Sequence, residues 1–122
     1  MNPPVFHIHL VSDATGETLN AIAKAALAQF EDVRVEEHAY TLVRSPRQLA
    51  RAIEHIGESP GLVFFTLVNP DLQRELISQC TRMDVPCLDV MAGPVAALRA
   101  FLGVAESHRP GGQHEVDQRY LH

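Results

Sequence analysis

Four strand-like stretches, each followed by a helical pattern, fill the first 103 residues of this chain, and this alternation constrains its fold most strongly. The predicted strands are Val5–Val11, Val33–Tyr40, Gly61–Val68 and Val85–Val90. Strands that alternate with helices pair in parallel through right-handed crossovers. We therefore expect an α/β fold of three layers, Rossmann-like or flavodoxin-like, with a four-stranded parallel sheet in the order 2-1-3-4 and helices on both faces.

Two of the predicted strands differ in their pattern of apolar residues. Gly61–Val68 is apolar without alternation, which is typical of a central strand covered on both faces. Val33–Tyr40 alternates apolar residues with Arg34, Glu36 and His38, which favours a half-exposed strand nearer the sheet edge. The sheet is therefore expected to hold the first of these in its middle and the second toward one side.

The first strand carries two histidines on one face, His7 and His9, because side chains at i and i+2 of a strand point the same way. Such a pair could hold a metal, but no third ligand is recognisable in the local sequence. We therefore expect no metal site. The ring nitrogens are expected to be satisfied against a helix, a neighbouring protomer or water.

Local chemistry marks where the helices begin and end. Ser45–Pro46 and Asn69–Pro70 each combine a capping side chain with a proline that suits the first helical turn. Gly57 is expected to end the second helix, and Gly103 the last one, which Gly93–Pro94 opens. The first helix is expected to bury Leu19, Ile22, Ala23, Ala26, Leu27 and Phe30. The last helix is expected to bury Val95, Leu98, Phe101 and Leu102.

The turn between the first strand and its helix is the candidate ligand site. In an open α/β sheet this turn lies at the carboxyl edge, where backbone N–H groups of the next helix point outward. Hydroxyl side chains and a glycine gather in it, as in a phosphate cradle. In the alternative interpretation, Asp13 or Ser12 only caps the helix and nothing binds. The candidates for phosphate or ligand binding are Ser12, Asp13, Thr15, Gly16 and Thr18.

The predicted strand order places the turns after the first and third strands side by side. Ser12–Thr18 and Asn69–Asp71 would then line one crevice, with Tyr40–Ser45 at its margin. Three arginines cluster around the start of the second helix: Arg44, Arg47 and Arg51. They could bind an anionic ligand or an acidic protein, or form a solvated helix face. We take them as partner-binding candidates.

Composition limits the classes of partner and the cellular location. The net charge of -5 argues against nucleic acid and anionic membranes, because no basic stripe is present to displace counterions. No apolar run approaches the ~20 residues that span a bilayer, and the first four residues do not resemble a signal peptide. We therefore expect a cytoplasmic protein whose two cysteines, Cys80 and Cys87, are reduced core residues.

The chain changes character after residue 104. Residues 105–114 are polar and rich in turn formers, and the residues that follow have few apolar side chains to bury. We therefore expect one α/β domain over residues 1–104 and a linker over residues 105–122 that leads to a second domain outside this chain.

Several of these segments together resemble the amino-terminal half of the regulatory proteins of pyruvate, phosphate dikinase and phosphoenolpyruvate synthase. The resemblance lies in His9–Asn20, Leu42–Ser45, Gly61–Val63, Thr66–Val68 and Val85–Cys87. The residues similar to the family's passage between its two halves are Pro110, Gly111, Gln113, His114, Asp117 and Tyr120. The resemblance covers essentially the whole chain, and its opening motif leans toward the dikinase regulators.

This resemblance implies a bifunctional enzyme in the full-length protein. Family members phosphorylate a threonine of the target enzyme with ADP as donor, releasing AMP, and remove that phosphate in a phosphate-dependent reaction that forms pyrophosphate. The family's phosphate loop, Gly-x-Ser-Arg-x-x-Lys-Thr-Pro, lies in the second half. This chain has no such loop, because its only lysine, Lys24, is followed by Ala25.

The resemblance therefore implies that no catalytic residue of the family lies in this chain and that no cofactor binds to it. ADP and phosphate would be substrates of the full-length protein. We expect the fragment to be inactive alone and to serve homodimerisation, recognition of the dikinase or synthase, or closure of one side of the active site.

Two other protein classes with this topology provide alternatives. Asp13–Thr18 is similar to the Thr/Ser-x-Thr-Gly-x-Thr loop with which flavodoxins hold flavin mononucleotide, but an acid takes the first position and only Tyr40 could stack on a flavin. A response-regulator receiver needs an aspartate at the end of a central strand, where this chain has Leu67, Val68 and Asn69. A flavodoxin-like nucleotide- or phosphate-binding module therefore remains the alternative.

Overall fold

The computed structural model describes residues 3–104, in which four strands alternate with four helices. The strands are β1 (Val5–Ser12), β2 (Arg34–Tyr40), β3 (Leu62–Thr66) and β4 (Cys87–Asp89). They form one parallel sheet in the order β2-β1-β3-β4, so the predicted fold class and strand order are confirmed. As predicted, β3 lies inside the sheet and β2 lies at its edge.

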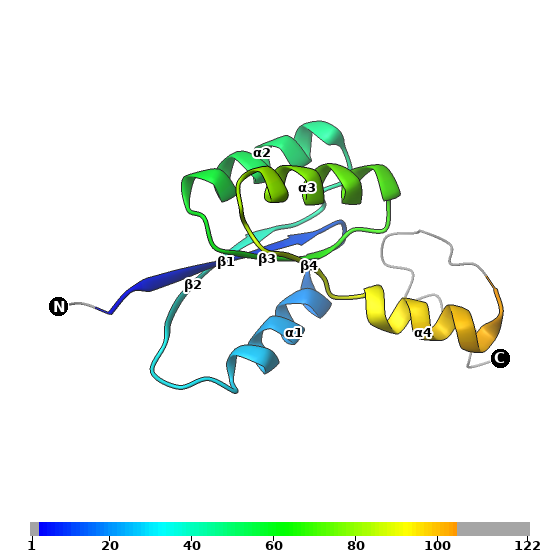
Figure 1. Cartoon of the computed structure of the whole chain (residues 1–122), viewed down its shortest axis with the longest axis horizontal. Helices are drawn as coiled ribbons and strands as arrows, with labels where there is room; N and C mark the ends of the chain where they lie inside the picture. The colour runs from blue at the N-terminus through cyan, green and yellow to red at the C-terminus, as the bar shows by residue number, and fades with distance from the viewer. Residues whose placement is uncertain (1–2, 105–122) are drawn as a thin grey trace.

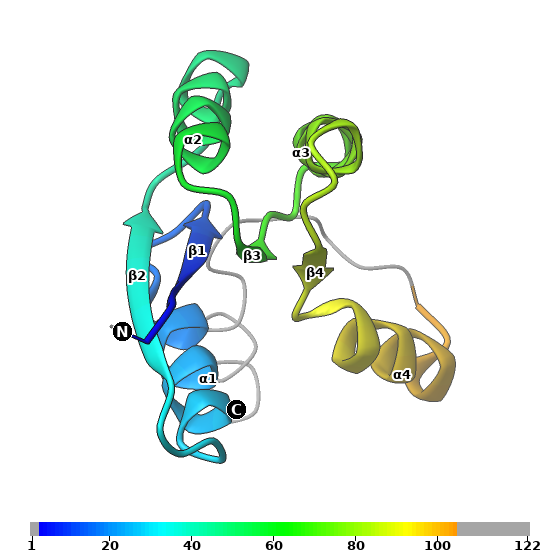
Figure 2. The ribbon, with the colours of Figure 1, turned by 60° about the vertical axis from the view of Figure 1, so that its left-hand side comes forward.

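Helices lie on both sides of this sheet and produce the expected three layers. Figure 1 shows α2 (Pro46–Glu58) and α3 (Pro70–Arg82) side by side on one face. Figure 2 shows α1 (Glu17–Leu27) and α4 (Ala92–Leu102) on the opposite side. None of the helices within residues 3–104 has the length and apolar character that a membrane crossing requires.

Each face of the sheet has its own apolar core. The larger core, beneath α2 and α3, consists of Val11, Val43, Leu49, Ile56, Val63, Phe65, Leu67, Leu72, Leu76, Cys80 and Val85. The smaller core, beneath α1, consists of Ile8, Leu10, Leu19 and Ala23. Alternate residues of β1 contribute to the two cores because neighbouring side chains of a strand point to opposite faces. The α2–α3 layer therefore provides most of the buried apolar contact.

The predicted starts of α2 and α3 are confirmed by their caps. Ser45 Oγ accepts the backbone N–H of Gln48 at 3.2 Å. Asn69 Oδ1 accepts the backbone N–H groups of Asp71 at 2.8 Å and Leu72 at 3.3 Å. In both helices a proline follows the cap, where its missing N–H leaves no hydrogen bond unmade.

The two predicted glycine stops have different outcomes. Gly103 ends α4 in the left-handed conformation, with φ +69°, as predicted. The predicted stop at Gly57 is wrong, because α2 continues to Glu58 and Gly57 does not have a positive φ. A glycine ends a helix only where the backbone turns left-handed, and composition alone does not reveal that turn.

The buried face predicted for α1 is only partly correct. Leu19 and Ala23 are buried and Leu27 is half-buried, whereas Ile22 and Ala26 are exposed. The helix ends at Leu27, so the predicted contribution of Phe30 is wrong, and this side chain is 66% exposed. Only the α1 side chains that lie directly on the sheet are buried, because α1 forms this small core with β1.

The inward face predicted for α4 is wrong. The helix has no buried residue, Val95 is half-buried, and Phe101 is 86% exposed. Leu98 and Leu102 are also more than half exposed. Apolar spacing alone did not reveal whether anything covers this helix, and β4 is only three residues long and offers α4 little surface.

Both cysteines are free thiols, as predicted. Cys80 is buried in the larger core and Cys87 is half-buried on β4. The hydrogen bond with Cys80, together with burial, raises the pKa of the Cys87 thiol, so that thiol stays protonated near neutral pH. The predicted linker, residues 105–122, lies outside the described residues, and so do the six residues similar to the family's passage between halves.

Candidate functional site

The turn after β1 is stabilised by its own polar side chains. Ser12 is 2% exposed, and its Oγ accepts the backbone N–H of Ala14 at 3.0 Å. Asp13 is 5% exposed, and its Oδ2 accepts the backbone N–H of Val68 at 2.8 Å. Two of the five ligand-binding candidates therefore already have hydrogen-bond partners within the chain.

Burial also changes the acidity of Asp13. It raises the pKa of the carboxyl above its usual value, because the charged form loses solvation. The N–H of Val68 and the positive charge of Arg44 oppose this effect without cancelling it. Arg44 lies close because its Nε donates a hydrogen bond to the backbone oxygen of Asp13 at 2.7 Å.

The loop after β2 is bound to the same turn. The N–H of Leu42 donates to the oxygen of Ala14 at 3.0 Å, and the N–H of Val43 donates to that of Ser12 at 3.0 Å. Together with the bond from Val68, these contacts bring the loops after β1, β2 and β3 into one cluster. The predicted adjacency of the turns after β1 and β3 is confirmed, since hydrogen bonds join them directly. The predicted shared crevice is not seen in the hollow beside the first turn, because Asn69–Asp71 do not line it.

The start of α1 differs from the predicted cap. Gly16 precedes the helix with φ +86°, a left-handed conformation that favours glycine. No side chain within residues 3–104 caps α1, so the expected cap by Ser12 or Asp13 is wrong, because both side chains bond elsewhere. The first N–H groups of the helix, including those of Glu17 and Thr18, lie at the positive end of its dipole.

A hollow of about 330 Å³ lies between the start of α1 and the end of β2. It is lined by three of the predicted candidates, Ser12, Thr15 and Gly16. Glu17 and Glu37 also line it, and two carboxylates would repel a bound phosphate. These two carboxylates disfavour phosphate binding at this turn, and the binding itself stays a prediction.

The three arginines named as partner-binding candidates lie around the start of α2. Arg44 is joined to the turn after β1, as described above. Arg47 and Arg51 are exposed and one turn apart on α2, and neither takes part in an ion pair within residues 3–104. These two guanidinium groups form a basic surface that is free to contact another molecule.

A second polar cluster lies on the sheet face beneath the end of α2, and its centre is His9. His9 is fully buried, and its Nε2 donates a hydrogen bond to the backbone oxygen of Ser59 at 2.7 Å. In the neutral ring the other nitrogen, Nδ1, therefore carries no proton and accepts a hydrogen bond from the hydroxyl of Tyr40 at 2.9 Å. Burial lowers the pKa of His9, so the ring is neutral at pH 7. The expectation that this histidine is satisfied against a helix is confirmed in part, because Ser59 caps the end of α2 but Tyr40 belongs to β2.

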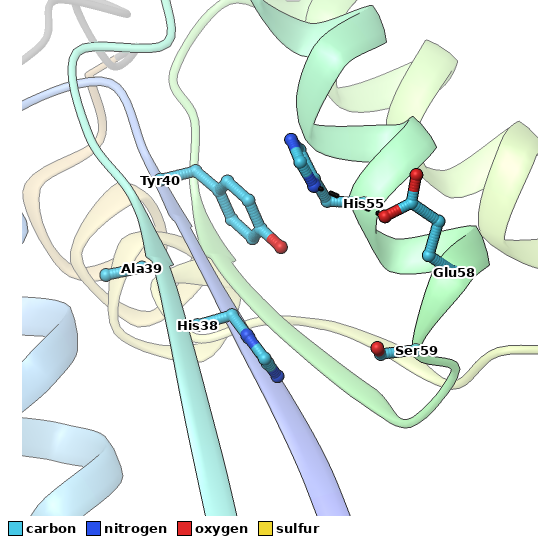
Figure 3. A pocket seen from close by; sticks show the side chains of 6 residues that line it. All are labelled: His38, Ala39, Tyr40, His55, Glu58 and Ser59. Atoms are coloured by element: carbon cyan, nitrogen blue, oxygen red, sulfur yellow. Dashed lines mark ion pairs between the residues drawn. The ribbon is translucent and has the colours of Figure 1, made fainter.

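Beside this ring, a hollow of about 420 Å³ opens between β2 and the end of α2. Figure 3 shows His38 and Tyr40 pointing from β2 toward His55 and Glu58 of α2. Sequence reasoning missed this cluster, because the histidines of β1 and β2 are 31 residues apart in the chain. The signal that could have revealed it was the alternation of polar side chains along β2, because these side chains form a cluster only when β2 pairs with β1.

Comparisons with known proteins identify the family to which the chain is similar. Residues 8–122 match the model of the kinase/pyrophosphorylase family. The chain is 47% identical over 116 residues to a protein of Caulobacter vibrioides and 48% identical over 116 residues to one of Hyphomonas neptunium, each named as a pyruvate, phosphate dikinase regulatory protein. A protein of Erythrobacter litoralis with the same name is 47% identical over 115 residues.

These matches include nearly all of the chain but a smaller part of each relative. They cover 95%, 95% and 94% of this chain, and 37%, 41% and 41% of the Caulobacter, Hyphomonas and Erythrobacter proteins. The chain therefore spans about two fifths of the length of these relatives. Because the family match extends over almost the whole sequence, the chain belongs to the kinase/pyrophosphorylase family.

Proposed function

We propose that this chain is the amino-terminal portion of a regulatory protein that phosphorylates and dephosphorylates a threonine of pyruvate, phosphate dikinase. The family match over residues 8–122 carries the proposal. The names of the relatives support the dikinase as the target, and the family description pairs a kinase with a pyrophosphorylase.

The proposed chemistry consists of two phosphoryl transfers. In the kinase direction the threonine hydroxyl attacks the β-phosphorus of ADP, the bond to AMP breaks, and the hydroxyl proton is lost. In the other direction orthophosphate attacks the phosphorus of phosphothreonine, which frees the threonine and forms pyrophosphate. Both transfers require a site that positions phosphates and neutralises their charge.

Residues 3–104 offer little of that machinery. Lys24, the only lysine of the chain, lies in the last turn of α1 and is exposed, away from the turn after β1. No glycine-rich loop in the described part of the chain leads to a lysine followed by serine or threonine. We therefore place the nucleotide site in the part of the relatives that these 122 residues do not span.

The role that the structure supports best for this portion is recognition of the dikinase. Arg47 and Arg51 present two unpaired positive charges on one face of α2. Arg44 joins the loop before α2 to the turn after β1, which anchors the start of the helix that carries these charges. A basic surface favours docking of an acidic surface on the partner.

A phosphoryl-transfer assay tests the activity. ADP labelled on its β-phosphate is mixed with the dikinase and with either the 122-residue chain or a chain extended by about 150 residues, one further domain. We expect label on the dikinase only with the extended chain, and none on a dikinase variant whose target threonine is valine. Transfer by the 122-residue chain, or none by the extended chain, would contradict the proposal.

A binding measurement tests the recognition role. The extended chain carrying Arg47→Glu and Arg51→Glu should bind the immobilised dikinase at least about tenfold more weakly, and the loss should be larger at low salt. Arg82→Glu is the matched control, since Arg82 is an exposed arginine at the end of α3. Equal binding by all three proteins would exclude this surface while leaving the transfer reaction itself untouched.

A further inference from the structure

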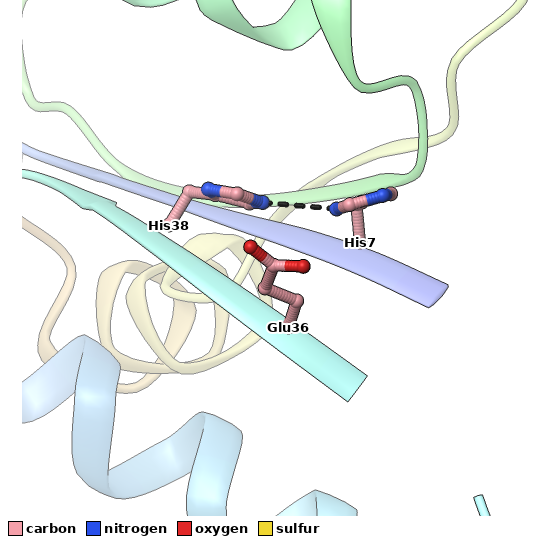
Figure 4. A group of neighbouring side chains, drawn as sticks. All are labelled: His7, Glu36 and His38. Carbon is pink, nitrogen blue, oxygen red and sulfur yellow. Dashed lines mark hydrogen bonds between the residues drawn. The ribbon is translucent and has the colours of Figure 1, made fainter. Parts of the chain in front are cut away.

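Three side chains with metal-binding atoms face one another on the sheet side that carries α2 and α3. They come from His7 of β1 and from Glu36 and His38 of the neighbouring strand β2. His7 Nδ1 and His38 Nε2 lie 3.0 Å apart. Figure 4 shows the Glu36 carboxylate pointing toward the gap between the two rings. One ligand atom from each residue lies within 4.8 Å of the other two.

The rings of this group are already ordered by the residues around them. His38 stacks on His9 with centroids 4.7 Å apart and an interplanar angle of 17°. His9 cannot turn freely, because Tyr40 and Ser59 hold both of its ring nitrogens. His7 in turn stacks on His38, with ring centroids 5.2 Å apart. Ligands that are fixed in advance lose little conformational freedom when an ion binds.

The distance between the two ring nitrogens is close to the one that a tetrahedral metal requires. Tetrahedral ligand atoms about 2.0–2.2 Å from Zn²⁺ lie about 3.3–3.6 Å from one another, so the two ring nitrogens need to separate by only a few tenths of an ångström. Glu36 is exposed and makes no ion pair within residues 3–104, so its side chain can rotate to bring a carboxylate oxygen into place. Two imidazoles and a carboxylate leave a fourth position for water.

From this geometry we propose that His7, Glu36 and His38 bind one divalent transition-metal ion, for which Zn²⁺ fits best. Imidazole nitrogens suit Zn²⁺, Ni²⁺ and Cu²⁺, whereas Mg²⁺ and Ca²⁺ prefer oxygen ligands. The ion would join the edge strand β2 to β1 beside the hollow of Figure 3. The proposal does not depend on the dikinase-directed function.

Metal analysis of the 122-residue chain tests the site directly. The chain is prepared without a histidine tag, dialysed against Zn²⁺ and analysed for bound metal by mass spectrometry. We expect one Zn²⁺ per chain, which a large excess of Mg²⁺ does not displace. Replacing Zn²⁺ with Co²⁺ should produce the visible absorption of a tetrahedral ion.

Substitutions test which residues hold the ion. His38→Asn and Glu36→Gln should each weaken Zn²⁺ binding by at least about tenfold. Glu36 is exposed, so its variant tests the site even where the histidine variant fails to fold. His55→Asn is the matched control, because this exposed histidine lies nearby on α2 but outside the three-residue group.

The three histidines beyond residue 104 require a control of their own. A chain with His108, His114 and His122 all replaced by asparagine should bind Zn²⁺ as tightly as the original. Nitrogen-15 NMR of the histidine rings should place the ion on Nδ1 of His7 and Nε2 of His38. Binding that survives both His38→Asn and Glu36→Gln, or that is lost with the three distal histidines, would overturn the proposal.

Discussion

Asp13 joins two loops at the carboxyl edge of the sheet through one carboxylate oxygen. Its sequence position suggested either a helix cap or a ligand-binding group, and the structure shows it bound to the N–H of Val68. The partner lies 55 residues away in the chain, so local sequence could not reveal it. At the residue scale, the sequence placed Asp13 in the turn after the first strand, but the partner of its carboxylate can be identified only from the folded structure.

Asp13 variants test this contact. Asp13→Ala removes the acceptor of the Val68 N–H and should lower the free energy of unfolding by about 1–3 kcal/mol. Asp13→Asn keeps an acceptor oxygen and should cost less. Urea unfolding of both variants beside the original chain measures the difference, and equal losses would show that the carboxylate's charge matters more than its hydrogen bond.

Burial of Asp13 also predicts a pH dependence. Because its pKa is raised above 3.8 in the fold, the native state binds the proton more tightly than the unfolded chain. The carboxyl therefore favours the fold most below the unfolded pKa, and this contribution is lost as pH rises through the raised native pKa. The free energy of unfolding of the original chain, minus that of Asp13→Asn, should fall over this range in urea titrations. A difference that is constant or rises with pH would contradict this assignment.

Gly61 is a second residue whose role depends on a distant backbone. A Cβ at this position would lie 1.9 Å from the backbone oxygen of His7, so β3 could not approach β1 as closely. We expect Gly61→Ala to lower the free energy of unfolding by about 3 kcal/mol or more. Gly93→Ala is the control, because a Cβ there meets nothing within 4 Å, and it should change stability by less than about 1 kcal/mol.

At the scale of elements, the strands and the starts of α2 and α3 were predicted well, whereas the cap of α1 and the covering of helix faces were not. The caps of α2 and α3 depend on residues within one turn, which is why their signals in the sequence were reliable. The apolar faces of α1 and α4 were both predicted from spacing, yet α1 buries Leu19 and Ala23 whereas α4 buries no residue. Spacing is a property of one helix, but burial depends on its neighbours.

Two helix residues test this difference. Leu76 on α3 is fully buried, so Leu76→Ala should lower the free energy of unfolding by about 2–5 kcal/mol. Phe101 on α4 is 86% exposed, so Phe101→Ala should change it by less than about 0.5 kcal/mol. Both are measured by urea unfolding of the 122-residue chain. A large loss at Phe101 would mean that α4 packs against a surface outside residues 3–104.

At the scale of the whole molecule, the strand order was the most useful prediction from the sequence. It followed from the alternation of strands and helices and from the strand order of doubly wound folds, and it brought the loops after β1, β2 and β3 together. The expected division of the chain at residue 104 stays a prediction, because the residues after it lie outside the described part.

Truncation tests that division. A chain ending at Val104 should have a free energy of unfolding within about 0.5 kcal/mol of the full 122 residues, since the removed segment is polar and has few apolar side chains to bury. Comparison of urea midpoints and of amide NMR spectra would measure this. A loss of several kcal/mol would show that residues 105–122 belong to the folded domain.

Hydrophobic patterning and local capping signals determined the fold class of this protein, its element order and its turn after the first strand. These features depend on residues that are near one another in the chain, so they can be recognised without coordinates. Tertiary structure alone decided that His7, Glu36 and His38 meet, that Asp13 reaches the loop after β3, and that α4 is left exposed. The physical reason is that each of these outcomes depends on surfaces that come together only when distant strands pair and helices pack.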